Sequence, residues 1–190
     1  MRSTIRIPQA PAEPMPELAA FLEPFQVHFT RSEGRHALDR YLTGLLTELP
    51  NKNCDPIAAG IPGTSEQQLQ GLLSTTAWDH DDLNRQRVQQ MLQLPSEGDG
   101  VLIFDDTGFA KPGKCSAGVA RQHSGTLGKK GNCQITVNCH YAERTVAWPV
   151  ATRLYLPRQW AEDLTRRRRA RVPAEITFQT KPQIALALLD

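Results

Sequence analysis

The stretch VLIFDDT, residues 101–107, decides which kind of fold the sequence predicts. Its first four residues form a continuous apolar run, which is typical of a β-strand covered on both faces. Asp105 and Asp106 follow directly, and we expect them at the end of this strand. A carboxylate beside a buried strand is costly to desolvate unless a partner or a cation compensates its charge. The acidic pair therefore calls for a structural or a functional explanation.

Two interpretations of the acidic pair are open. Turn statistics favour a pair that ends the strand and begins a turn at Thr107-Gly108. The alternative is a Mg²⁺ site, because Mg²⁺ prefers carboxylate oxygens as ligands. Adjacent residues of a strand point to opposite faces, so at most one of Asp105 and Asp106 can easily face a common ion.

Upstream of this stretch, apolar residues recur every three or four positions from Pro16 to about Leu94, which predicts amphipathic helices. A first helix should run from Pro16 to Phe29, a break is expected near residues 30–34, and a second helix should follow and be closed by Pro50. Signals of helix N-termini mark three further helices: Asp55-Pro56, Thr64 with Gln67, and the acidic residues Asp79, Asp81 and Asp82. The pattern predicts an all-α bundle over residues 1–97.

Downstream, the sequence predicts strands. A polar segment rich in glycine and lysine, residues 108–132, is expected to be a loop. Apolar and polar residues then alternate from Cys133 to Tyr141, which predicts a second strand. Glu143-Arg144 should turn the chain into a third strand over residues 145–156, and Lys181-Pro182 should begin a helix. Three successive strands predict an antiparallel meander, so the expected fold class is α+β, with domains at 1–97 and 98–190.

Composition excludes several classes of protein. The chain has 190 residues, of which 39% are hydrophobic and 22% charged, as in an ordinary globular protein. No apolar run is long enough to cross a bilayer, and the N-terminus lacks the apolar core of a signal peptide, so we expect no membrane association and a cytoplasmic location. Four cysteines without CxxC spacing argue against a disulfide framework and a zinc site.

Positive charge is concentrated in the second half of the chain. Residues 1–100 have a balance of −5, from eight basic and thirteen acidic residues, whereas residues 101–190 have +7, from fourteen and seven. The densest run, Arg166, Arg167, Arg168 and Arg169, is either a solvated loop or a set of phosphate contacts. We prefer the basic residues of the loop after the first strand as DNA contacts, because that loop is anchored next to Asp106: Lys111, Lys114, Arg121, Lys129 and Lys130.

Two blocks carry a family resemblance, DDTGFAKPGK at residues 105–114 and GVARQHSGTLGKKGNCQ at residues 118–134. With the flanking segments, from about Phe29 to Asp190, they resemble the front of the catalytic domain of bacterial insertion-sequence transposases of the DDE superfamily endonuclease class. The resemblance implies an RNase H-like fold whose first strand carries the first of three metal-binding acids. By resemblance this acid is Asp106, with Asp105 as the fallback, and the complete enzyme would use Mg²⁺ to cut and transfer DNA strands.

The resemblance also implies that this chain holds only part of that domain. The second Asp and the Glu of the family would lie beyond the helix that begins at Lys181, so we expect an incomplete RNase H-like fold with its first three strands and first helix. Such a chain should be inactive by itself, and its first strand should have a free apolar edge. Its expected partners are DNA, a second copy or an intact transposase. The alternative is a non-enzymatic DNA-binding or assembly module derived from a transposase.

Overall fold

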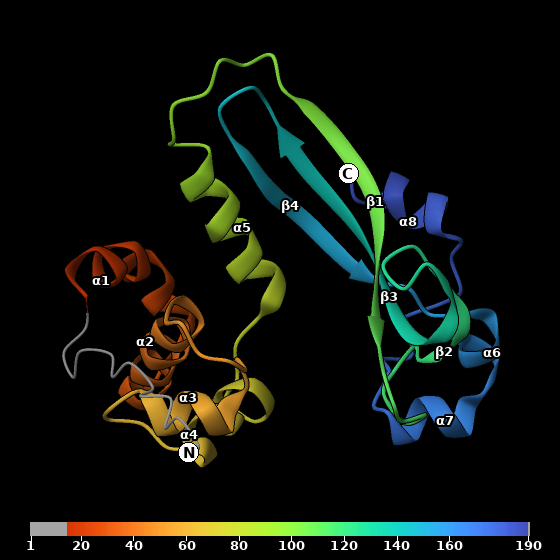
Figure 1. Ribbon diagram of the computed structural model, residues 1–190, viewed down its shortest axis with the longest axis horizontal. Coiled ribbons are helices and arrows are strands. Elements are labelled where there is room, and N and C mark those ends of the chain that lie inside the picture. The colour runs from red at the N-terminus through yellow and green to blue at the C-terminus, as the bar shows by residue number, and fades with distance from the viewer. Residues whose placement is uncertain (1–14, 190) are drawn as a thin grey trace, which may run out of the picture. The chain divides into compact units, whose positions relative to one another are not determined.

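The computed structural model describes residues 15–189, which divide into two compact units, one ending at Gln90 and the other beginning at Met91 (Figure 1). Our expected domain boundary lies a few residues later, after residue 97. The described part of the first unit contains helices, and the second contains an antiparallel sheet with further helices. The fold class is therefore α+β. None of the helices between residues 15 and 189 has the length and apolar character needed to cross a membrane.

The helices of the first unit follow the apolar periodicity of the sequence. They are α1 (Pro16–Leu22), the 3₁₀-helix η1 (Glu23–His28), α2 (Ser32–Leu46), α3 (Cys54–Gly60), α4 (Glu66–Ser74) and α5 (His80–Met91). Helices α2, α3 and α4 enclose a core around Ile57, Ile61 and Leu69. Gly44 of α2 permits this packing, because a Cβ at that position would come within 2.4 Å of the Ile57 side chain.

Two expected helix boundaries are wrong. The first helix ends at Leu22 instead of Phe29, because Pro24 lacks the N–H that an α-helix interior needs and the chain continues as η1. The fourth helix is capped by Ser65, whose hydroxyl accepts a hydrogen bond from the Gln68 N–H, and not by Thr64. The expected cap of α5 is confirmed, since the Asp79 carboxylate accepts hydrogen bonds from the N–H groups of Asp81 and Asp82.

The second unit is built around one long strand, β3 (Lys129–Ala142). Strand β1 (Val101–Ala110) pairs with one edge of β3, and β2 (Ala120–Ser124) and β4 (Ala147–Leu154) pair with successive parts of the other edge, all antiparallel. Three short helices follow, α6 (Arg158–Glu162), α7 (Leu164–Arg169) and α8 (Lys181–Ala187). The predicted alternation in β3 is confirmed, because Cys133, Ile135, Val137 and Cys139 are buried.

The expected loop over residues 108–132 is partly wrong. Strand β1 continues through residues 108–110, and β2 forms a hairpin with the start of β3. The sequence pattern did not predict these strands because one face of the hairpin is polar and exposed. The turn contains Gly128, whose φ of 62° costs glycine less than residues with a side chain. The sheet consequently has four strands where the sequence predicted three.

The expectation that residues 101–104 are covered on both faces is also wrong. Val101, Leu102 and Ile103 are 59%, 49% and 47% exposed. Within residues 15–189, β1 pairs with β3 alone, so its second edge has no neighbouring strand (Figure 1). The apolar run of residues 101–104 therefore belongs to a strand with one free edge, and not to a strand covered on both faces.

All four cysteines are free, as their spacing predicted. Cys133 and Cys139 belong to the buried face of β3, and burial raises the pKa of the Cys139 thiol. Both thiols therefore belong to the core, and the raised pKa of Cys139 disfavours its reactive thiolate form.

Candidate functional site

The acidic pair lies in the middle of β1 and not at its end. Four more residues of β1 follow Asp106, and they pair with residues 133–136 of β3. In the register of the sheet, Asp106 lies opposite Val137 and Asp105 lies opposite Asn138. Val137 belongs to the buried face of β3, so Asp106 is on that face and Asp105 is on the other. The expectation that only one of the two acids could face an ion agrees with this arrangement.

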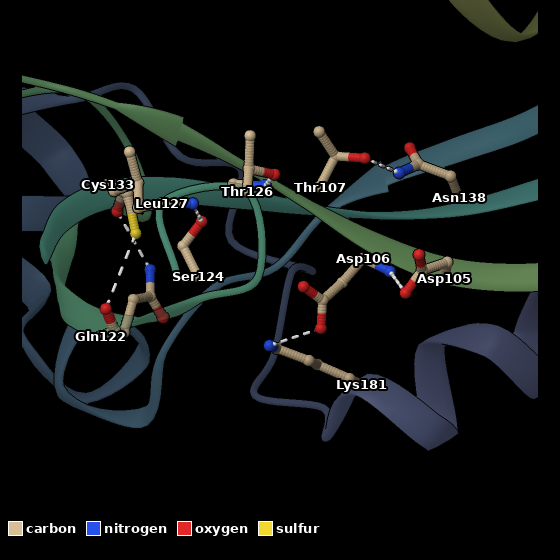
Figure 2. Close-up of polar contacts among 11 residues, drawn as sticks. Asp105, Asp106, Thr107, Gln122, Ser124, Thr126, Leu127, Cys133, Asn138 and Lys181 are labelled. Atoms are coloured by element: carbon tan, nitrogen blue, oxygen red, sulfur yellow. Dashed lines mark hydrogen bonds and ion pairs between the residues drawn. The ribbon is translucent and has the colours of Figure 1, made fainter. Parts of the chain in front are cut away.

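The carboxylate of Asp106 forms an ion pair with the first residue of α8. The Lys181 ammonium lies 2.8 Å from Asp106 Oδ2, and the side chains of Lys181 and Asp106 are 34% and 31% exposed (Figure 2). Helix α8 contacts β3 and buries Ile184. The packing of α8 therefore brings a cation to Asp106 from 75 residues along the chain.

The Asp105 carboxylate makes a different kind of contact. It is bound to the backbone, since Asp105 Oδ1 accepts a hydrogen bond of 2.7 Å from the Asp106 N–H (Figure 2). The neighbouring positions on its face are uncharged and polar: Asn138 Nδ2 donates to Thr107 Oγ1 at 3.0 Å, and Thr152 donates to Asn138 Oδ1. Of the two acids, Asp106 is thus the one whose carboxylate is bound to a cation.

Asp106 fits a divalent ion as one ligand. Its Oδ2 atom already forms an ion pair with the Lys181 ammonium, and a carboxylate is the donor that Mg²⁺ prefers. Between residues 15 and 189, however, no group of three or more metal-ligating side chains includes Asp106. The metal ligands found at Asp106 are therefore fewer than the several converging acids that two-metal chemistry needs.

A cluster of Asp79, His80 and Asp81 has the spacing of a metal site but a simpler explanation. All three side chains are exposed, and Asp79 caps α5. The hydrogen bond from the Asp82 N–H is the main reason that the pKa of Asp79 lies below its ordinary value. The cluster is therefore the acidic N-terminus that the sequence predicted for this helix.

The predicted basic residues of the glycine-rich segment lie on the β2–β3 hairpin and in the loop between β1 and β2. Lys111 follows the last residue of β1, five residues beyond Asp106, or roughly 17 Å at about 3.3 Å per residue. Arg121, Lys129 and Lys130 are exposed on the β2–β3 hairpin, and Lys114 is exposed in the loop before it. The turn of this hairpin packs against β1 two residues beyond Asp106, since the Gly108 N–H donates a hydrogen bond to Thr126 Oγ1 at 3.3 Å. That these basic residues contact DNA near Asp106 stays a prediction.

The arginine run forms helix α7 and divides into two pairs. Helix α7 begins where the Asp163 carboxylate accepts a hydrogen bond from the Arg166 N–H. The Arg166 guanidinium lies 3.8 Å from the centroid of the Trp160 ring and donates to the carbonyl oxygens of Lys114 and Val119. These contacts anchor the loop that carries Lys114.

The other three arginines of the run differ in exposure. Arg167 donates to four carbonyl oxygens, including those of Pro173 and Ile176, and so fixes the segment after α7. Arg168 and Arg169 are exposed. The predicted solvated loop is therefore wrong as a description of Arg166 and Arg167, whose charged ends are bound to the fold.

Sequence reasoning missed Lys181 as a site residue. It recognised Lys181-Pro182 only as a helix start, which α8 confirms. No spacing signal could reveal the ion pair, since the two partners lie 75 residues apart and meet only when α8 packs against the sheet.

Comparisons with known proteins indicate a single family. The profile of a family described as "DDE superfamily endonuclease" matches residues 24–190. The chain is similar to a protein of Microchaete diplosiphon named "Probable transposase for insertion sequence element IS701", with 30% identity over 151 residues. The match covers 79% of this chain and 37% of that protein, so the chain spans little more than a third of the relative's length. No solved structure matches the chain.

Proposed function

We propose, from the premise that this chain belongs to the DDE superfamily endonucleases of insertion-sequence transposases, that Asp106 is the first metal-binding acid of a transposase catalytic domain. The observation that carries the proposal is the ion pair between Asp106 and Lys181, since it shows a half-buried carboxylate that binds a cation. Asp105 is the weaker candidate, because its carboxylate is bound to the backbone on the opposite face of the sheet.

Enzymes of this superfamily use divalent metal ions. Such ions stabilise the attacking and leaving oxygens of phosphoryl transfer and stand about 3.5–4 Å apart in two-metal sites. The contribution of this chain is the Asp106 carboxylate, held in the interior of a strand by the ladder of hydrogen bonds between β1 and β3. A strand interior is a rigid support, which suits a ligand that has to keep its position during the reaction.

We infer that residues 1–190 alone do not cleave DNA. A single carboxylate supplies too few ligands for two metal ions, and among the described residues no group of three or more metal-ligating side chains includes Asp106. The matched relative is much longer than this match, and its further length is where we expect the other acids of such an enzyme. In this proposal Mg²⁺ is the ion of the complete enzyme.

DNA is the proposed partner, and exposed basic residues are the proposed phosphate contacts. The exposed members of the predicted set lie on the β2–β3 hairpin, in the loop before it and at the end of α7: Lys114, Arg121, Lys129, Lys130, Arg168 and Arg169. Lys111 is half-buried, and Arg166 and Arg167 bind the fold, so we assign these three mainly to holding the surface in place. Phosphate contacts of exposed residues release counterions, so binding should weaken as salt rises.

A second candidate function is favoured by the free edge of β1. A strand edge with exposed apolar side chains can pair with another chain. In this role the chain would be a DNA-binding or assembly module that associates with a second copy or with an intact transposase, without catalysis. Either role acts on DNA, so we propose the cytoplasm as its location, with which four free cysteines agree.

The proposal is tested in a full-length transposase that contains this segment. Asp106→Asn removes the charge that would bind the ion but keeps the side chain's size. We expect it to abolish strand cleavage in Mg²⁺ while DNA binding in a gel-shift assay persists. Asp105→Asn is the matched control and should keep cleavage. If the Asp106→Asn protein still cleaves DNA, Asp106 is not the catalytic acid.

A further inference from the structure

Lys181 is the residue that the proposed function leaves unexplained. Within the described residues, its ammonium is the one charged partner of Asp106, at 2.8 Å from Oδ2. Figure 2 shows the lysine side chain reaching from the start of α8 toward the strand and ending beside the Asp106 carboxylate. A cation thus lies where a metal ion bound to the same oxygen would have to lie.

The start of α8 is fixed in a way that aims Lys181 at Asp106. The Thr180 side chain accepts a hydrogen bond from the Gln183 N–H, and the Gln183 side chain accepts one from the Thr180 N–H. This reciprocal pair sets the backbone on both sides of Lys181. Ile184, one turn further on, is buried where α8 packs against the sheet. The ammonium also lies 5.7 Å from the centroid of the Tyr155 ring.

We propose that Lys181 is a tethered cation that occupies the metal-binding carboxylate of Asp106 until a divalent ion displaces it. This inference rests on the proposed function, because it assumes that Asp106 binds the ion. The ammonium and a metal ion cannot bind the same oxygen at the same place, and like charges so close together repel each other. An ion that binds Oδ2 therefore requires the Lys181 ammonium to leave that oxygen.

A purely structural role explains less. Both side chains are about one third exposed, and ion pairs that water reaches contribute little to folding. The helix is held by its capping box and by Ile184, which do not depend on the ammonium. Lys181 can therefore leave Asp106 without undoing α8, as a displaceable cation must.

The test measures where and how tightly iron binds a full-length transposase that contains this segment. Fe²⁺ stands in for Mg²⁺, and in the presence of ascorbate and peroxide it cuts the peptide backbone beside its ligands. Cutting near residue 106 is followed by mass spectrometry as the Fe²⁺ concentration rises. We expect Lys181→Gln to reach half-maximal cutting at several-fold less Fe²⁺ than the wild type. Lys181→Arg keeps the cation and should stay close to the wild type.

Three controls make the result decisive. Arg31→Gln removes one positive charge from an exposed position of the first unit and should leave the midpoint unchanged. Asp106→Asn should remove the cut near residue 106. Lys181→Met keeps the aliphatic stem beside Tyr155 and should shift the midpoint as Lys181→Gln does, which provides a second variant if the first does not fold.

The outcomes separate the two proposals. Equal midpoints for the wild type and Lys181→Gln, with cutting at residue 106 in both, would overturn the role of Lys181 and leave Asp106 as a metal ligand. Absence of this cut from both folded proteins would overturn both proposals. A lower midpoint in Lys181→Gln and Lys181→Met, but not in Lys181→Arg or Arg31→Gln, supports the displacement of Lys181 by the ion.

Discussion

Asp105 and Asp106 are neighbours in the sequence but lie on opposite faces of β1, opposite Asn138 and Val137 of β3. The alternation of a β-strand alone separates them and leaves Asp106 on the face that α8 contacts. Because of this register, one acid is bound to a cation from α8 and the other to its own backbone. The pairing of β1 with β3 therefore decides which of the two acids faces Lys181, and the proposed metal site follows that face.

Replacing Arg166 should destabilise the second unit through lost contacts, and not through lost charge. Arg166→Ala removes the cation–π contact with Trp160 and two hydrogen bonds to the loop before β2. We expect the free energy of unfolding to fall by roughly 1–3 kcal/mol, measured by urea denaturation. Arg168→Ala, on the same helix but exposed, is the matched control and should change it by less than about 0.5 kcal/mol. Equal effects of the two variants would contradict the structural role of Arg166.

Replacing Glu143 should change how stability depends on pH. Burial raises the pKa of the Glu143 carboxyl, but hydrogen bonds from Ser96, Tyr141 and the Glu97 N–H outweigh it and hold the pKa below its ordinary value of 4.5. A lowered pKa in the folded state means that the stabilisation is present above pH 4.5 and is lost as pH falls through the folded value.

The measurement is the thermal unfolding midpoint between about pH 6 and about pH 3. As pH falls below 4.5, the unfolding midpoint of the wild type should decrease steeply, and that of Glu143→Gln should decrease less. Glu175→Gln, at an exposed position, serves as the control. Identical pH profiles for the wild type and Glu143→Gln would show that the carboxylate does not tie residues 96–97 to the end of β3.

The free edge of β1 should make the chain self-associate. Ile103 lies in the exposed apolar part of this edge strand, and a lysine there should block pairing with another chain. Sedimentation velocity should show concentration-dependent association for the wild type and a shift toward monomer for Ile103→Lys. Val27→Lys, at an exposed apolar position of the first unit, should not cause that shift. A wild type that stays monomeric at all concentrations would rule out the edge as a contact surface.

DNA binding should lose salt dependence when the hairpin loses its charges. The paired change of Lys129 and Lys130 to glutamine should reduce the slope of log K against log salt by about 0.9 for each phosphate contact removed. The loss should be similar for unrelated duplexes, because phosphate contacts carry no sequence information. Arg31→Gln is the matched control in the first unit. An unchanged slope would place the phosphate contacts elsewhere on the chain.

Local patterns predicted the elements they could encode, and the remainder depends on contacts between distant residues. Alternation between Cys133 and Tyr141 predicted the buried face of β3, and the acidic residues before α5 predicted its capped start. The β2–β3 hairpin was missed because one of its faces is polar and its turn is marked mainly by glycine. Lys181 was missed because no sequence spacing connects it with Asp106.

The resemblance identified Asp106 as the leading candidate acid before its surroundings were known. Periodicity alone could not choose between the two acids, since shifting a strand by one residue exchanges its faces. The contacts of Arg166 and Arg167 could not be predicted from the sequence either. An arginine that binds carbonyl oxygens cannot be distinguished by sequence from one that faces solvent.

Direct ligation of a metal ion by Asp106 is tested best by exchanging its oxygen donor for sulfur. In a full-length transposase that contains this segment, Asp106→Cys offers a thiolate, which suits Mg²⁺ poorly and softer divalent ions better. We predict that this variant does not cleave DNA in Mg²⁺ and recovers cleavage in Mn²⁺, while Asp105→Cys cleaves in both. Wild-type cleavage by Asp106→Cys in Mg²⁺ would contradict the account, because the ion would then not depend on the Asp106 carboxylate.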